Sequence, residues 1–213
     1  LIFREKLSRI AFSETAYYDS VISNYFNKIS NTLFPEKKIF HANLIETPRY
    51  GENPHQKSGI YSKNLNMNIK QINGKQLSYN NYNDIFSALN ISKSLPKNIG
   101  TVIVKHGNPC GVSIKKNHVE SYLSALSCDP VSAFGGIVSC NFKVTKNLAI
   151  ELNKLFLEVI VANSFDTKAL KILKMKKNLR LIDASNYSLK ENMRFVSSNS
   201  EILVQSEDMN KFN

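Results

Sequence analysis

Residues Thr101–Gly111 read TVIVKHGNPCG, and this stretch decides the architecture predicted for the chain. The β-branched run at residues 101–104 predicts a short buried strand. Lys105 and His106 follow it, and we expect the Gly-Asn-Pro-Cys-Gly run at 107–111 to form a turn that cannot continue the strand. In open α/β sheets, ligands bind just outside the carboxyl end of a strand. An ammonium and an imidazole at that place can hold an anion and move a proton, which predicts a functional site. The alternative is a pair that caps the strand and faces solvent.

Outward from this strand, segments with helical spacing of apolar residues alternate with short β-branched runs, which predicts an α/β fold. We expect Ser13 to cap the first helix, residues 72–83 to form a turn and a polar loop, and Asp84 to cap a short helix that ends at Pro96. The other expected helices are residues 10–29, 145–157 and 167–175 and one that begins after Asn117; the expected strands are 101–104, 137–140, 158–161, 179–182 and 202–204. A connector at residues 30–48 carries the predicted domain boundary, near residue 41.

The net charge of +11 invites a nucleic-acid interpretation. The lysines are scattered, however, often beside asparagine, as at Lys115–Asn117 and Lys176–Asn178. We therefore favour a solvated basic surface that steers anionic small molecules, with a basic RNA-binding module as the alternative. Three cysteines without paired spacing favour a reducing, cytoplasmic setting. No membrane span and no signal peptide are expected, and a chain that begins without Met is expected to be part of something longer.

A second motif, Arg49–Gln56 (RYGENPHQ), places an arginine before a glycine turn. Such a segment can make bidentate anion contacts and bring its backbone close to a ligand. The alternative is an exposed loop rich in turn-forming residues. His55 on its own is more often a hydrogen-bonded structural histidine than a ligand-binding one.

The His106–Cys110 segment is partly similar to the zinc deaminase signature, which pairs a His-x-Glu element with a later Pro-Cys-x-x-Cys. Asn108 stands where the glutamate is needed and Ser113 where the second cysteine is needed. Since a catalytic zinc needs three protein ligands, we predict no metal, and a zinc-type nucleobase deaminase remains the enzymatic alternative. Lys105 and His106 suit proton transfer better than they suit metal binding. The Lys105 ammonium disfavours the imidazolium form of His106, which leaves that ring able to accept a proton.

Three blocks, Arg49–Gln56, Lys105–Gly111 and Asp129–Gly136 (DPVSAFGG), occur in this order. Together they resemble the AICAR formyltransferase/IMP cyclohydrolase family of bifunctional purine biosynthesis proteins. The resemblance extends through Gly74–Asn81, Glu158–Ala162 and Ile202–Gln205, although Asn163 stands where the family has a proline. It implies that residues 1–40 are the helical end of the cyclohydrolase domain and its linker. It implies that residues 41–213 are the first, incomplete lobe of the formyltransferase domain, with a cytidine-deaminase-like fold.

The resemblance also implies a reaction and its residues. The formyl group of 10-formyltetrahydrofolate, a co-substrate, would pass to the 5-amino group of AICAR ribotide, and the other domain would cyclise the product to IMP. Lys105 and His106 would be catalytic. The residues expected to bind substrate are Arg49, Tyr50, Asn53, His55, Asn108, Gly135 and Glu158.

Further expectations concern the whole protein. The resemblance implies a cytosolic homodimer without nucleic-acid or membrane partners. Because the second lobe and the cyclohydrolase catalytic residues would lie outside residues 1–213, we expect this chain alone to be inactive.

Overall fold

The computed structural model describes residues 1–64, 66–189, 193–206 and 208. They divide into two compact units. The first comprises Leu1–Thr47 and Ser58–Met67, and the second comprises Pro48–Lys57 and Asn68–Asn213. The boundaries of these units do not coincide with the domain assignment 1–40 and 41–213, which stays a prediction.

The first unit contains helix α1 (Ile2–Ile29) and the antiparallel pair β1 (Asn43–Glu46) and β2 (Ile60–Ser62). The helix begins eight residues earlier than predicted, and Ser13 is not its cap. Ser13 lies in the helix interior, where its hydroxyl donates to the Arg9 carbonyl at 2.8 Å. A mid-helix serine commonly makes this bond four residues back, so the residue type alone did not mark a terminus.

The second unit is built on a six-stranded mixed sheet in the order β3-β8-β7-β6-β4-β5. The three strands β6, β7 and β8 run parallel to one another. The edge strand β3 is antiparallel to β8, and β4 is antiparallel to both β6 and β5. The strands are β3 (Lys70–Asn73), β4 (Gly100–Lys105), β5 (Asn108–Ile114), β6 (Ile137–Val144), β7 (Val159–Phe165) and β8 (Arg180–Asp183). The predicted α/β class is confirmed at this level.

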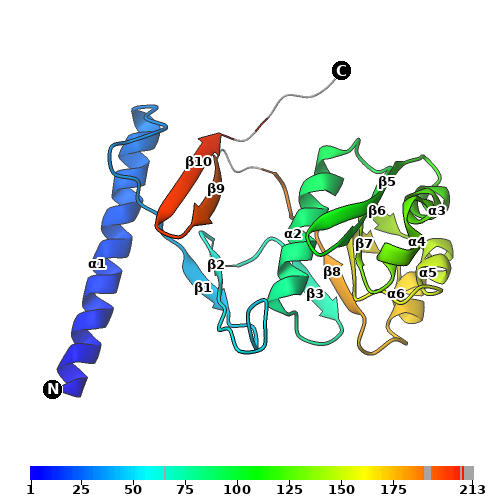
Figure 1. Ribbon diagram of the computed structural model, residues 1–213, viewed down its shortest axis with the longest axis horizontal. Coiled ribbons are helices and arrows are strands. Elements are labelled where there is room, and N and C mark those ends of the chain that lie inside the picture. Colours follow the sequence, from blue (N-terminus) through cyan, green and yellow to red (C-terminus); the bar gives the residue numbers. More distant parts are fainter. Residues whose placement is uncertain (65, 190–192, 207, 209–213) are drawn as a thin grey trace. The chain divides into compact units, whose positions relative to one another are not determined.

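Helices cover both faces of this sheet, with α2 (Tyr79–Ser94) on one face and α3 (His118–Cys128), α5 (Lys146–Leu152) and α6 (Thr167–Leu173) on the other (Figure 1). Alternate strand residues therefore enter two separate layers: Ile103 and Val138 pack with α3, α5 and α6, whereas Val102 and Val104 lie on the opposite face. Burial on both faces explains why these strands read as continuous apolar runs in the sequence.

The central prediction was right about the strand and wrong about the length of the turn after it. Only His106 and Gly107 form the turn, and both have positive φ, +52° and +76°. This conformation suits a two-residue hairpin, and the chain returns at once as β5, with Lys105 opposite Asn108. Pro109 is tolerated because β5 is an edge strand and the pairing is irregular beside it.

Helix α2 also begins earlier than predicted. Ser78 is its N-cap, with its hydroxyl accepting from the Asn81 backbone N–H while the Asn81 side chain accepts from the Ser78 N–H. This capping box makes the first turn out of residues that were expected to be a polar loop. Asp84 lies in the second turn of the helix and does not cap it.

The other helices follow the predicted order with shorter bounds. Asn117 caps α3 as predicted, accepting from two backbone N–H groups. A short helix, α4 (Pro130–Ala133), begins after Asp129 and was not predicted. The last predicted strand is present as β10 (Glu201–Ser206), which pairs with β9 (Met193–Ser198) in a hairpin separate from the six-stranded sheet. Of the helices described, none has the length and apolarity that crossing a membrane requires.

Candidate functional site

A cavity of about 940 Å³ lies at one end of the six-stranded sheet. It is bounded by the carboxyl ends of β3 and β4, by the amino ends of β6, β7 and β8, and by the amino end of α2. Cationic side chains outnumber carboxylates in its lining. The cations of the described lining are Arg49, Lys75, Lys105, Lys176, Lys177 and Arg180, and the carboxylates are Asp84 and Glu158. This charge balance, with a helix amino terminus at the same place, suits an anionic ligand.

Lys105 and His106 line this one cavity together. Lys105 is the last residue of β4, and its ammonium donates to the Phe134 carbonyl. Gly135 follows with φ +69°, and a Cβ atom built on it would lie 3.2 Å from Lys105 Nζ. A glycine at this position therefore leaves room for the ammonium beside the loop that precedes β6.

Asp84 connects the turn after β4 to helix α2. Its Oδ1 atom accepts the Gly107 backbone N–H at 2.6 Å. Burial raises the pKa of the Asp84 carboxyl, while the backbone hydrogen bonds of Gly107 and His106 and the charge of His106 act in the opposite direction. The carboxylate thus fixes the strained turn that carries the imidazole.

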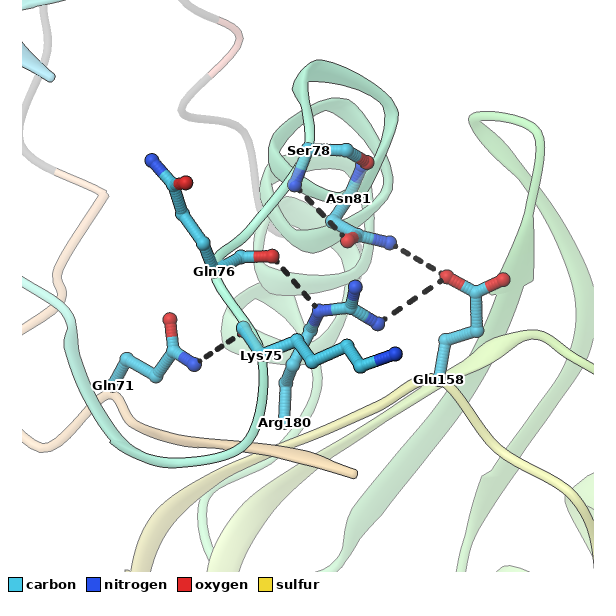
Figure 2. A network of polar contacts seen from close by, with 7 residues as sticks. All are labelled: Gln71, Lys75, Gln76, Ser78, Asn81, Glu158 and Arg180. Atoms are coloured by element: carbon cyan, nitrogen blue, oxygen red, sulfur yellow. Dashed lines mark hydrogen bonds and ion pairs between the residues drawn. The ribbon is translucent and has the colours of Figure 1, made fainter. Parts of the chain in front are cut away.

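A second polar network in the cavity lining holds Glu158, the residue that precedes β7 (Figure 2). Its Oε2 atom accepts from Asn81 Nδ2 at 2.9 Å and lies 3.7 Å from Arg180 Nη1. The backbone joins the same two strands, since the Arg180 N–H donates to the Glu158 carbonyl at 3.1 Å. Arg180 Nε reaches the Gln76 carbonyl at 3.3 Å, so three chain segments meet at this carboxylate.

Arg49 and Tyr50 lie in the segment 48–57 and line the cavity. The Arg49 guanidinium carbon is 5.8 Å from the centre of the Tyr50 ring. Burial lowers the pKa of Arg180, and the positive charge of Arg49 acts in the same direction while Glu158 opposes it. Both guanidinium groups line the same cavity, which adds to the positive charge of its wall.

Six of the nine residues predicted for the site line the cavity: Arg49, Tyr50, Lys105, His106, Gly135 and Glu158. The other three do not. Asn53 forms a local turn in which its backbone N–H donates to Gln56 Oε1 at 2.7 Å, and His55 is exposed. Asn108 is exposed at the start of β5, where its amide donates to the His106 carbonyl at 3.0 Å. Their role in substrate binding stays a prediction.

Several other lining residues were not among the predicted site residues. The local pattern predicts Asn81 in a loop and Asp84 as a helix cap, and it places Lys176 and Lys177 on a solvated surface. In the structure Lys176 also donates to the Asn153 and Leu155 carbonyls, at 2.6 and 3.2 Å. Only the sheet topology brings these segments to the cavity, so no local pattern could have identified them.

Cys110 does not face a partner that would complete a metal site. Its thiol donates to the Ile103 carbonyl at 3.6 Å. Within the residues that the structure describes, no group of three or more His, Cys, Asp or Glu side chains has the arrangement to hold a metal ion.

The fold and the cavity define an α/β protein with a basic cavity whose lining includes the imidazole of His106 and the ammonium of Lys105. The AICARFT/IMPCHase bienzyme family model matches residues 1–213, and the chain belongs to that family. The bifunctional purine biosynthesis protein PurH of Listeria welshimeri is 41% identical over 210 residues, covering 96% of this chain and 41% of the relative. PurH of Prochlorococcus marinus (strain MIT 9215) is 43% identical over 222 residues, covering 98% and 43%.

The chain therefore spans about two fifths of the length of these curated relatives. Among solved structures, Acinetobacter baumannii RibD, form 2, is 17% identical, with a TM-score of 0.34 over 47% of this chain and 34% of that one. A likeness of that size assigns no fold.

Proposed function

We propose that this chain carries the first lobe of an AICAR formyltransferase and acts in purine biosynthesis. It would bind AICAR ribotide for formyl transfer from 10-formyltetrahydrofolate, ahead of closure to IMP by the cyclohydrolase domain. The observation that carries the proposal is the single cavity that joins Lys105 and His106 to the Arg49 segment and to a surplus of cations.

The chemistry explains why such a pair is needed. The 5-amino group of AICAR is a poor nucleophile because the carboxamide-bearing imidazole withdraws its lone pair. As the amine nitrogen bonds to the formyl carbon, His106 accepts the amine proton. The bond from that carbon to the folate nitrogen then breaks, and Lys105 assists protonation of the departing nitrogen. Holding the amine in the right orientation against the formyl group supplies the rest of the rate enhancement.

The cavity supports a matching placement of the nucleotide. Arg49, which lines the cavity, would lie near the phosphate. Tyr50 binds the nucleotide beside Arg49, and Gly135 and Glu158 contact the heterocycle or the ribose. A guanidinium can bind phosphate through two parallel hydrogen bonds, which fixes orientation as well as affinity.

The proposal extends to the rest of the protein. Residues 1–40 would end the cyclohydrolase domain, and residues 41–213 would form a cytidine-deaminase-like lobe. Active-site and folate-binding groups of a second lobe would lie outside this chain. The full-length protein would be a cytosolic homodimer, and the 213-residue chain alone would bind nucleotide without turnover.

The test has two parts. Calorimetric titration of the 213-residue chain with AICAR ribotide should show binding that Arg49→Met weakens by roughly tenfold or more, since a hydrogen bond to a charged group contributes about 1.5–3 kcal/mol. In the full-length protein, His106→Ala should lower formyl transfer by roughly 10²- to 10⁴-fold while sparing cyclisation of preformed formyl-AICAR.

Two results would contradict the proposal. One is a folded wild-type chain that does not bind AICAR ribotide but binds oligonucleotides in a salt-dependent manner, as an RNA-binding module would. The other is a folded His106→Ala protein that retains formyl transfer. Turnover by the 213-residue chain alone would refute only the assignment of essential groups to a second lobe.

A further inference from the structure

The strongest additional feature of the cavity is the way in which Glu158 is held. Resting on the proposed function, the geometry points to Arg180 and Asn81 as positioning residues for this carboxylate. They fix Glu158 so that one of its oxygens accepts a hydrogen bond from an N–H or O–H donor of the bound nucleotide.

The backbone sets the first part of this arrangement. Glu158 immediately precedes β7, and Arg180 begins the parallel neighbour β8, where it pairs with Val159. The Arg180 N–H donates to the Glu158 carbonyl, which ties the two amino ends together. The two side chains are therefore placed side by side by sheet register and do not depend on a mobile loop.

Asn81 has a fixed orientation because it serves the helix as well. Its Oδ1 atom is used by the capping box of α2, where it accepts the Ser78 N–H at 3.2 Å. The amide nitrogen must then point the other way, and it donates to Glu158 Oε2. Asn81 is only 4% exposed, so this donor is buried in place.

Arg180 approaches the same oxygen as Asn81 does (Figure 2). Its side chain is 13% exposed, whereas that of Glu158 is 42% exposed. Its Nε–H is directed to the Gln76 carbonyl, which leaves Nη1 facing Glu158 Oε2 (Figure 2). A planar guanidinium can bridge these two acceptors, and a single ammonium cannot do so in the same geometry.

Both contacts fall on Oε2. Within the described part of the chain, Oε1 of Glu158 has no hydrogen-bond partner, and Figure 2 shows it directed away from Asn81 and Arg180. Glu158 lines the cavity, so this second oxygen is available to a ligand. A carboxylate whose other oxygen is already held loses less conformational freedom on binding than a free one.

The test is a double-mutant cycle on nucleotide affinity, with AICAR ribotide as the probe and the 213-residue chain as the protein. Arg180→Met should weaken binding about tenfold in the wild-type background and about twofold or less in the Glu158→Gln background. The difference is the coupling expected if Arg180 acts through Glu158. Lys75→Met is the matched control. It removes one positive charge from the same cavity, and its effect should be the same factor in both backgrounds.

Equal factors for Arg180→Met in the two backgrounds would overturn the inference, since Arg180 would then act on the ligand directly. If Arg180→Met does not fold, Arg180→Lys replaces it in the cycle, with the same dependence on Glu158 expected and the same equality refuting it. Failure of the wild-type chain to bind AICAR ribotide would refute the proposed function itself. Binding of AICAR ribotide without coupling between Arg180 and Glu158 would refute only the positioning role.

Discussion

Replacing Asp84 by asparagine should separate the hydrogen bond that holds the His106–Gly107 turn from the charge that accompanies it. Asparagine retains an oxygen at the Oδ1 position to accept the Gly107 N–H, now 2.6 Å from Asp84. It removes the negative charge of the half-buried Asp84 carboxylate. Burial raises the pKa of that carboxyl above its ordinary value of 3.8. The two contributions can therefore be measured with two substitutions, Asp84→Asn and Asp84→Ala.

The sign of the charge effect follows from linkage. Because the folded protein holds the Asp84 proton more tightly than the unfolded chain does, the contribution of this group is favourable below about pH 3.8. That contribution is lost as the pH rises through the higher folded-state pKa. Relative to wild type, Asp84→Asn should therefore gain stability between about pH 4 and pH 7.

The hydrogen bond to Gly107 determines how much stability the other substitution, Asp84→Ala, should cost. Asp84→Ala leaves the partly buried Gly107 N–H without its acceptor, which costs about 1–3 kcal/mol. Asp84→Asn should lie within about 0.5 kcal/mol of wild type at pH 7, or above it, because the acceptor remains. Urea denaturation of the three proteins at pH 4 and pH 7 measures both differences, and other titrating groups cancel between them.

The reasoning would be refuted by an Asp84→Asn protein that is more than about 1 kcal/mol less stable than wild type at pH 7 and recovers on acidification. That result would mean that the ionised carboxylate is a net stabiliser. An Asp84→Ala protein as stable as wild type would show that the turn does not depend on this hydrogen bond.

Two further substitutions address the surroundings of the site and the far end of the sheet. Gly135→Ala places a Cβ 3.2 Å from Lys105 Nζ at φ +69°, so it should cost about 1–2 kcal/mol in urea denaturation and reduce formyl transfer by the full-length protein. Wild-type turnover in this variant would show that the ammonium needs no such clearance. Asn163→Leu removes the acceptor of Lys93 Nζ, at 2.7 Å, and the donor to the Asn141 carbonyl, and should cost about 2 kcal/mol. Asn163→Asp, which keeps only the acceptor, is its control, and equal stability of Asn163→Leu and wild type would contradict the assignment.

The central strands were predictable from the sequence for a physical reason. Residues 101–104, 137–140, 158–161 and 179–182 are apolar runs because helices cover both faces of those strands, and each run lies in β4, β6, β7 or β8, with residues 158 and 179 just before β7 and β8. The outer strands lacked such a signal. β3 reads KQIN and β5 reads NPCGVSI, and their strand conformation depends on pairing with a distant partner.

The predicted start of α2 was wrong because three polar residues of the kind that cap helices lie close together in the sequence. Ser78, Asn81 and Asp84 all favour helix starts, and only the reciprocal hydrogen bonds of Ser78 and Asn81 decide between them. Prediction of the candidate site from local sequence was limited in the same way. His106 and Arg49 belong to recognisable motifs, whereas the position of Arg180 at the cavity depends on the parallel pairing of β7 with β8.

Strand direction accounts for the position of the whole site. The rule that ligands bind at carboxyl ends, applied to β4, indicates the end of the sheet where the cavity lies, but β4 runs antiparallel to β6. The same edge of the sheet therefore carries the amino ends of β6, β7 and β8, and Glu158 and Arg180 stand at two of those ends. In a mixed sheet, polar residues that precede a buried strand are consequently as informative as those that come after one. The residue before an apolar run should be examined whenever an antiparallel strand lies within the same sheet.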